Sequence, residues 1–82
     1  MVETTLWRLQ KGQTGTVTRT DLDERTVRRL TDLGLVRGTA VMRLYDAPSG
    51  DPSAYALRGT VLALRKSDAS HIYIRLAKDG EP

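Results

Sequence analysis

The stretch Ala47–Gly59, APSGDPSAYALRG, contains the residues that decide the fold. Two prolines and Gly50 stand near its start, and each proline removes a backbone N–H from any strand ladder. SAYALR then has the composition of a short strand, and Gly59 can turn it into a second apolar run, TVLAL. We therefore expect two consecutive turns here, joining three antiparallel strands.

The remaining strands are predicted on either side of this stretch. Thr39–Tyr45 (TAVMRLY) is the longest, Gly15–Thr20 (GTVTRT) alternates, and Ile72–Leu76 (IYIRL) comes last. The segment between Gly12 and Gly15, GQTG, is interpreted as a turn. In the longest strand we expect one face to carry Ala40, Met42 and Leu44 and the other to carry Val41, Arg43 and Tyr45. Tyr45 and Tyr55 bracket the proline-rich turn, and a cross-strand pair between them is one interpretation.

One helix is predicted, beginning at Asp21. Asp21 and Glu24 have the spacing of a capping box, with Asp21 as the N-cap. Gly34 has the position of a C′ glycine, and Leu35 can fold back in a Schellman motif. The helical period predicts an apolar side with Val27, Leu30 and Leu33, and a basic side with Arg25, Arg28 and Arg29.

About five short antiparallel strands, with one helix inserted after the first, predict a mainly β fold. Short helical turns are expected at Thr5–Leu9 and Arg65–Ser70. This pattern is typical of a small SH3-like barrel, and an open α+β sheet with the helix on one face is the alternative. The 82 residues are expected to form a single domain with its core at about 5–76 and a polar tail at 77–82.

The composition argues against several classes of function. There is no cysteine, which excludes a disulfide framework and a thiolate metal site. His71 is the single histidine, with no serine or carboxylate at a catalytic spacing, and no phosphate-binding loop is present. We expect a protein that is not an enzyme and has no cofactor and no intrinsic metal site. Adventitious metal binding by His71 stays open.

The charge balance leaves several partners open. The formal net charge is +3, and ten of the 13 basic residues are arginine, whose fork pairs with carboxylates and phosphates. The basic side of the helix, extended by Arg37, is equally consistent with a solvated face and with a binding surface. The longest apolar run, Val61–Leu64, is far too short to cross a bilayer, and the N-terminus is unlike a signal peptide.

Four segments, in this order, resemble the ferrous iron transport A (FeoA) family. They are LWRLQKGQTGTV, RRLTDLGLVRGTAV at Arg28–Val41, APSGDP at Ala47–Pro52 and GTVLALRKSDASHI at Gly59–Ile72. The resemblance covers about residues 5–76. Two positions depart from the family pattern: Arg43 stands where an aliphatic residue is usual, and Arg37 stands where a proline is usual. Arg43 is therefore expected to leave its face of the strand partly exposed.

The resemblance implies an SH3-like barrel that works as a small cytoplasmic accessory protein of ferrous iron uptake. Such a protein would dock on the cytosolic GTP-binding domain of a FeoB-type transporter, support transport or modulate nucleotide turnover, and reach the membrane only through that partner. The same barrel resembles the C-terminal domain of DtxR-type metal-dependent repressors. A stand-alone relative of that domain and a small-barrel nucleic-acid-binding protein are the alternatives.

The candidate partner-binding residues are placed at the helix end and near the proline-rich turn. They are Arg28, Arg29, Leu35, Arg37, Tyr45, Ser49, Gly50 and Asp51. No nucleic acid is expected as a partner, because the chain lacks the interleaved aromatic residues on which single-stranded bases stack. Open strand edges also leave room for a weak homo-oligomer.

Overall fold

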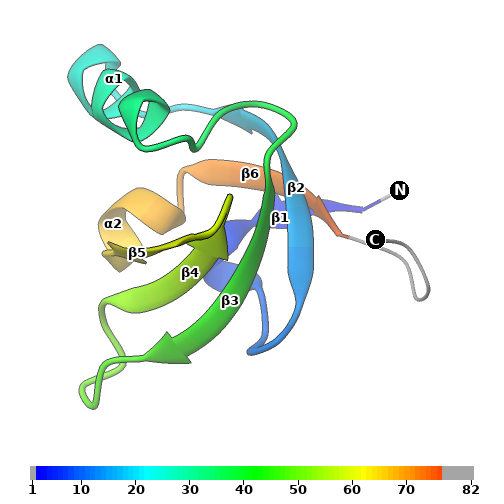
Figure 1. Ribbon diagram of the computed structural model, residues 1–82, viewed down its shortest axis with the longest axis vertical. Coiled ribbons are helices and arrows are strands. Elements are labelled where there is room, and N and C mark those ends of the chain that lie inside the picture. Colours follow the sequence, from blue (N-terminus) through cyan, green and yellow to red (C-terminus); the bar gives the residue numbers. More distant parts are fainter. Residues whose placement is uncertain (1, 77–82) are drawn as a thin grey trace.

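The computed structural model describes residues 2–76, so the predicted polar tail at 77–82 lies outside the described residues. Six antiparallel strands form one sheet in the order β1-β6-β2-β3-β4-β5 (Figure 1). The strands are β1 Glu3–Thr5, β2 Thr14–Thr20, β3 Ala40–Asp46, β4 Ser53–Leu57, β5 Thr60–Leu64 and β6 Ile72–Leu76. The helices are the 3₁₀-helix η1 Leu6–Arg8, the main helix α1 Glu24–Asp32 and the short α2 Lys66–Ala69.

The predicted mainly β fold with one helix after its first long strand is confirmed, with one strand more than expected. The additional strand is β1, whose three residues carry no apolar alternation and which pairs with β6, Glu3 lying opposite Arg75. Within residues 2–76 no ladder joins β1 to β5, so the sheet remains open and these two strands are its edges.

The core lies inside the bend of the sheet. Its side chains come from η1, from α1 and the loop after it, and from all the strands except β1, and α2 adds Ala69. The buried cluster consists of Leu6, Leu9, Val17, Leu30, Leu35, Val41, Tyr55, Leu57, Leu64, Ala69, Ile72 and Ile74. Because η1 contributes Leu6 and the segment after it contributes Leu9, the N-terminal turn is part of the core.

The start of α1 differs from the prediction. The N-cap is Asp23, whose side chain accepts a hydrogen bond from the Thr26 backbone N–H at 3.3 Å. Asp21 was wrongly predicted as the cap: it directly follows β2, and its backbone N–H donates to His71 O, just before β6, at 3.1 Å. The Asp21 carboxylate lies 2.7 Å from His71 Nδ1 and accepts from the Tyr73 hydroxyl.

The end of α1 is confirmed in detail. Gly34 has a φ of +94°, its N–H donates to Thr31 O at 3.0 Å, and the Leu35 N–H donates to Leu30 O at 2.9 Å. These are the two hydrogen bonds of a Schellman motif, and Leu30 and Leu35 are both buried beside it. The apolar side of the helix is narrower than expected, since Leu33 is 46% exposed.

The faces of β3 are predicted correctly only up to Arg43. The register shifts between Arg43 and Tyr45, as in a β-bulge, and this shift carries Tyr45 to the outer face, where it is 59% exposed. Tyr55 lies opposite Arg43 and is fully buried. The proposed pair between Tyr45 and Tyr55 is therefore wrong.

The two glycines of GQTG have different roles. Gly12 lies in a turn with a φ of +81°, as predicted. Gly15 lies within β2 between β3 and β6, and a Cβ on it would overlap the side chain of Ile74. Gly15 is therefore a strand glycine that permits close approach of β6.

Candidate functional site

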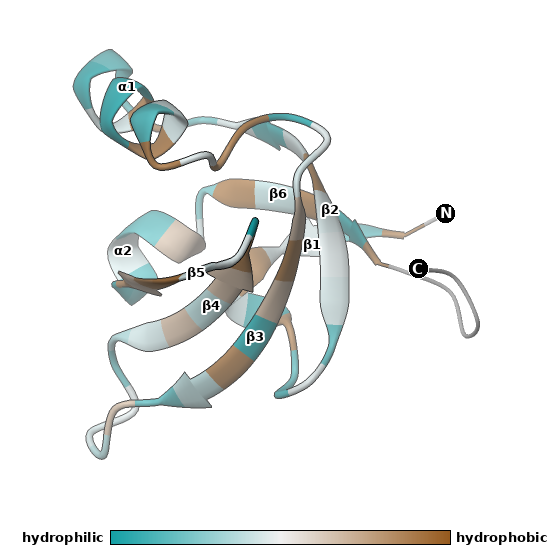
Figure 2. Ribbon diagram, viewed as in Figure 1, coloured by the Kyte–Doolittle hydropathy of each residue, from teal (hydrophilic) through white to brown (hydrophobic). Residues whose placement is uncertain are grey.

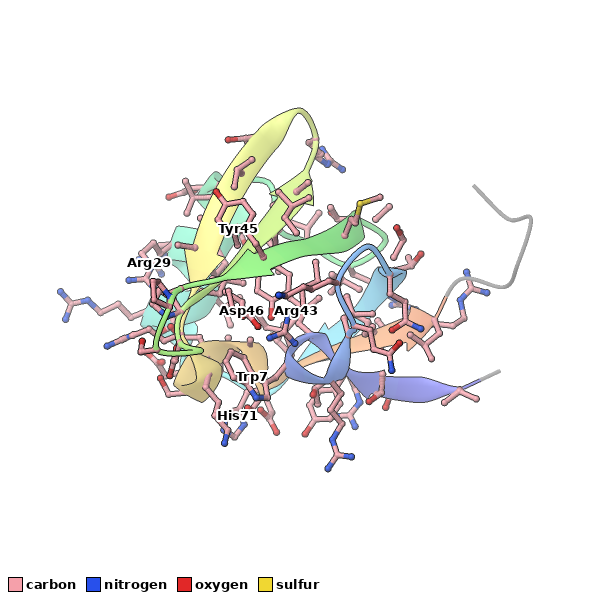
Figure 3. All side chains as sticks on the ribbon, turned by 90° about the horizontal axis from the view of Figure 1, so that it is seen from below. Trp7, Arg29, Arg43, Tyr45, Asp46 and His71 are labelled. Atoms are coloured by element: carbon pink, nitrogen blue, oxygen red, sulfur yellow. The ribbon has the colours of Figure 1, made fainter. Side chains whose placement is uncertain are left out.

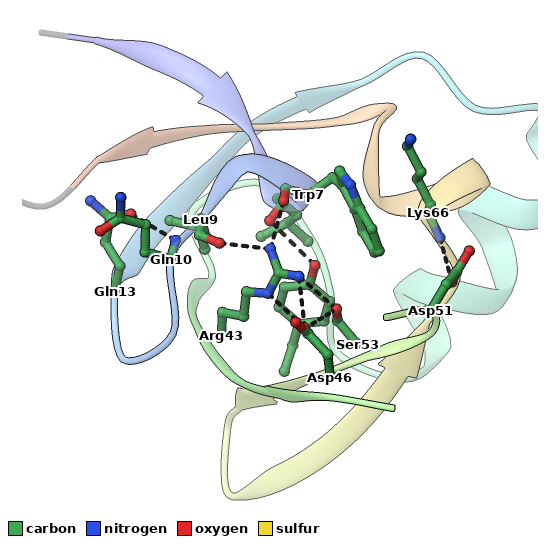
Figure 4. Close-up of polar contacts among 11 residues, drawn as sticks. Trp7, Leu9, Gln10, Gln13, Arg43, Asp46, Asp51, Ser53 and Lys66 are labelled. Atoms are coloured by element: carbon green, nitrogen blue, oxygen red, sulfur yellow. Dashed lines mark hydrogen bonds and ion pairs between the residues drawn. The ribbon is translucent and has the colours of Figure 1, made fainter. Parts of the chain in front are cut away.

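Arg43 is a buried structural residue, so the expectation that it exposes its face of the strand is wrong. Its side chain is only 11% exposed. Its Nη1 donates to the carbonyl oxygens of Trp7 at 2.6 Å and Leu9 at 2.7 Å, and its Nη2 donates to Asp46 Oδ1 at 2.7 Å (Figure 4). These contacts join the segment around η1 to β3. Nε also donates to Asp46 and Nη2 to Ser53, so every guanidinium N–H has an acceptor.

Asp46, whose side chain is partly exposed, completes this cluster. It accepts hydrogen bonds from Ser53 and from Arg43, and these donors hold the pKa of its carboxyl below the ordinary value of 3.8. The Arg43 guanidinium also lies over the Trp7 ring, with its Cζ 5.0 Å from the ring centroid. In Figure 3 Trp7, Arg43 and Asp46 occupy the middle of the view. We assign this cluster to the stability of the fold.

The structure does not bring the predicted partner-binding residues into one surface. Leu35 is 3% exposed and belongs to the core, so its side chain offers no contact to a partner. The turn containing Ser49–Asp51 and the helix α1 lie at opposite ends of the molecule (Figure 1). Asp51 accepts a hydrogen bond from the backbone N–H of Lys66 at 3.0 Å and thereby fixes the start of α2.

The arginines at the surface of α1 are exposed, and two of them have ion-pair partners. Arg28 lies 3.6 Å from Glu24 on the outer side of the helix. Arg29 points the other way, toward α2, and lies 3.7 Å from Asp68. Arg37 lies in the loop after α1, at a separate groove beside β2. Arg29 lines a different groove, which it shares with apolar side chains and with a second arginine, Arg65.

This groove runs between α1, β5 and α2, and we call it the α1–β5 groove. Its volume is about 270 Å³, and the residues that define it here are Arg29, Leu33, Leu62, Arg65 and Asp68. Leu33 was predicted to be buried, but as the C-cap of α1 it forms a half-exposed wall of the groove. Leu62 is half-buried on the facing side.

The groove is basic at its rim. Arg29 and Arg65 each place a guanidinium nitrogen 3.7 Å from the same oxygen of Asp68, whose side chain is 14% exposed. One carboxylate therefore faces two guanidinium groups, both more than half exposed, and positive charge is left in excess. Sequence reasoning missed Arg65 and Asp68, because only the folded sheet brings them next to α1. For the segment that contains Arg65 and Asp68, the sequence predicted only a short helical turn.

The described residues offer no metal centre. Among residues 2–76 no group of three or more His, Asp and Glu side chains is placed to hold a metal ion. His71 is exposed and paired with Asp21. In the same part of the chain no helix is both long and apolar enough to cross a membrane.

Comparison with known proteins gives a family and a fold. The FeoA domain model matches residues 4–76. The solution structure of FeoA from Chlorobium tepidum is similar with a TM-score of 0.87 and 35% identity, over 94% of this chain and 73% of that one. A FeoA-like protein from Clostridium acetobutylicum has a TM-score of 0.84 and 30% identity, over 100% and 95% of the two chains. The comparison with curated protein sequences found no match.

Two further similarities concern the fold. A FeoA from Stenotrophomonas maltophilia, solved with zinc and described as a prokaryotic SH3 domain protein, has a TM-score of 0.73 and 31% identity, over 85% of this chain and 87% of that one. The predicted SH3-like fold is thereby confirmed. A manganese-dependent transcriptional repressor has a TM-score of 0.84 at 23% identity, with 38% of its chain covered, and this likeness concerns the fold alone.

Proposed function

Since the chain belongs to the FeoA family, which is associated with ferrous iron transport, we propose that it is an accessory protein that docks on a FeoB-type transporter. Its docking site would be the cytosolic GTP-binding domain, and it would act from the cytoplasmic side, reaching the membrane only through this partner. The Stenotrophomonas maltophilia FeoA is described as a candidate activating factor of ferrous iron transport. We propose a corresponding role here, with an effect on transport or on nucleotide turnover.

The observation that carries this proposal is the α1–β5 groove with its basic rim. Its volume of about 270 Å³ is below the usual range for a site that encloses a small molecule, but it suits a protruding side chain of a protein. Two exposed guanidinium groups around one carboxylate favour an acidic partner surface. We therefore propose Arg29 as a contact residue and Arg28 as a neighbouring one.

The test is a binding titration of the purified protein with the isolated cytosolic GTP-binding domain of the same organism's FeoB-type transporter. We expect saturable binding at about 0.1 M salt, weakened as salt screens the charges. Replacing Arg28 and Arg29 with Glu should abolish binding. The unfolding midpoint should fall only modestly, because both side chains are exposed, although Glu24 and Asp68 would then face like charges. Unchanged binding by this double variant would remove the basic face of α1 from the proposal.

A second candidate function is nucleic-acid binding through the same arginines. It is favoured by the exposed Arg25, Arg28 and Arg29 along α1. It predicts that the protein binds DNA or RNA with an affinity that falls steeply and linearly on a log–log plot against salt. The same titration with duplex and single-stranded oligonucleotides decides between the two: retention of nucleic acid alone would overturn the docking proposal.

A further inference from the structure

The strand β5 is an edge strand whose outward backbone groups can be assigned. It joins β4 through the two residues Arg58 and Gly59, both with positive φ, at 48° and 77°, as in a type I′ turn. In such a hairpin the residues flanking the turn, Leu57 and Thr60, form a hydrogen-bonded pair. Pairs then alternate along the ladder, so the backbone N–H and C=O groups of Val61 and Ala63 point away from β4.

The side chains on the outer face of β5 continue an apolar surface. One cross-strand row runs through Met42, Ala56 and Val61, and a second runs through Tyr45, Ala54 and Ala63. Met42, Tyr45 and Val61 are 38%, 59% and 56% exposed. The strand β5 appears as one of the more hydrophobic strands in Figure 2, although it lies at the edge of the sheet.

The other face of β5 borders the α1–β5 groove, with Leu62 and Leu33 as its apolar walls. A strand added beyond β5 would therefore meet apolar surface on both of its faces. Native edge strands are commonly guarded by a lysine or proline within the strand, and Thr60–Leu64 contains neither. The edge thus offers two unpaired backbone positions flanked by apolar side chains.

Both ends of this edge carry positive charge. Arg58 precedes the strand and Arg65 follows it, and both are exposed. Arg58 is held beside the C-terminus of α1, since its Cδ lies 3.4 Å from where a Cβ of Gly34 would be. In an antiparallel pairing of two copies centred on Leu62, Arg65 of one chain would approach Arg58 of the other. Repulsion between these like charges would oppose that dimer. A strand with acidic ends would instead be complementary to the two arginines.

We infer that β5 binds an extended segment of a partner protein as a seventh strand, through the backbone of Val61 and Ala63. The segment is apolar in its middle and acidic at its ends, with its carboxylates placed at Arg58 and at the pair Arg29 and Arg65. One of its apolar side chains enters the α1–β5 groove. This inference rests on the proposed function, and it places the segment in the cytosolic GTP-binding domain of the transporter.

The experiment titrates the full chain with that isolated domain and records both affinity and amide hydrogen exchange. We expect the Val61 and Ala63 amides to exchange more slowly in the complex. The variant Ala63→Pro removes an outward N–H without removing a bond to β4, so binding should weaken at least tenfold. The matched variant Ala63→Ser keeps the N–H and should bind like the wild type.

Charge is tested on the same edge. Arg65→Glu should weaken binding at least tenfold, because it leaves a partner carboxylate facing like charge. The control variant Lys11→Glu makes the same change in net charge, but in the exposed turn before β2. It should weaken binding less than threefold. Thermal unfolding of each variant checks the fold. If Ala63→Pro does not fold, strand addition is tested by the amide exchange of the wild type and by the affinity of Arg65→Glu.

The outcomes separate this inference from the proposed function. Wild-type binding with unchanged exchange at Val61 and Ala63 would overturn strand addition and leave the docking proposal standing. The protein is also concentrated without any partner. If the Val61 and Ala63 amides then exchange more slowly and sedimentation shows dimers, the occupant of the edge is a second copy of the chain, and the proposed acidic partner segment is overturned. No binding of the wild type to the domain would overturn both proposals.

Discussion

Arg43 occupies a position in β3 whose neighbours on the inner face, Val41 and Tyr55, are fully buried. A charge at such a site costs free energy unless its donors are satisfied. Here the guanidinium meets two carbonyl oxygens, the Ser53 hydroxyl and the Asp46 carboxylate. The carbonyls belong to Trp7 and Leu9, so Arg43 also satisfies backbone acceptors that the short helix η1 leaves free.

Replacing Arg43 with Met should therefore be strongly destabilising. The variant leaves Asp46 without its cationic partner and leaves the two carbonyls without a donor, and we expect a loss of about 3 kcal/mol in the free energy of unfolding. Urea unfolding measures this loss. Arg25→Met, at an exposed arginine of α1, is the control and should change stability by no more than about 0.5 kcal/mol. Equal midpoints for the two variants would contradict the role given to Arg43.

Asp46 should contribute a pH-dependent part of the stability. Hydrogen bonds from Ser53 and Arg43 hold its pKa in the folded state below the ordinary 3.8. A carboxyl whose pKa is depressed by folding stabilises the protein above its unfolded pKa and loses this effect as pH falls through the folded pKa. Between about pH 5 and about pH 2.5 the wild type should lose more stability than Asp46→Asn.

The measurement is urea unfolding at a series of pH values for the wild type, Asp46→Asn and Ser53→Ala. Ser53→Ala removes one of the two donors to Asp46, so its loss of stability on acidification should be intermediate. Parallel curves for all three proteins would show that Asp46 titrates alike in the folded and unfolded states.

At the scale of single residues, the sequence predicted a residue's role correctly only where that role depends on its neighbours along the chain. The Schellman motif at Gly34 follows from helix geometry, and it was predicted down to Leu35. The direction of Tyr45 depends on a register shift between β3 and β4, which no local pattern reveals. The burial of Arg43 depends on carbonyls 34 and 36 positions away along the chain.

At the scale of elements, the strands adjoining Gly15 illustrate a constraint imposed by packing. β2 pairs with both β3 and β6, and the Ile74 side chain fills the space where a Cβ of Gly15 would project. The carbonyl oxygen of Arg75 lies 3.3 Å from the same point. The backbones of β2 and β6 can keep their spacing only with no side chain at this position.

Gly15→Ala should destabilise the protein by about 1 to 3 kcal/mol, as overpacking does in a closely packed core. Ile74→Val removes the Cδ1 atom that the new methyl would meet, at its own cost of about 1 kcal/mol. The double variant should therefore lose less stability than the sum of the single losses, which a double-mutant cycle measures. Simple additivity would mean that the strain does not arise at Ile74.

The elements themselves were largely predictable, and their exceptions have physical causes. Five strands, α1 and the helical turn at α2 were expected from alternation, period and turn residues. The strand β1 was not predicted, because it is short and its position is set by pairing with β6. The α1–β5 groove was not predictable, because Arg29 and Arg65 meet only after the sheet bends and α2 docks.

At the scale of the whole molecule, the sheet order places the first strand beside the last. β1 and β6 are antiparallel neighbours, and the Leu76 N–H donates to Val2 O at 3.3 Å. The helix α1 and the strand β5, which border the candidate groove, lie away from this pair (Figure 1). The hairpin turn between β3 and β4 lies at the far end from α1.

Because the two ends of the described chain are adjacent, a short flexible linker could join them and the backbone could be opened elsewhere. A circular permutant with new ends between Ser49 and Gly50, in the exposed turn, should keep the same sheet and an unfolding midpoint close to that of the parent. Two-dimensional amide spectra would check this, and loss of the β3–β4 signals would count against it. Such a permutant would leave β5 and its turn to β4 uninterrupted, and a reporter could be attached at the opened hairpin, at the far end from α1.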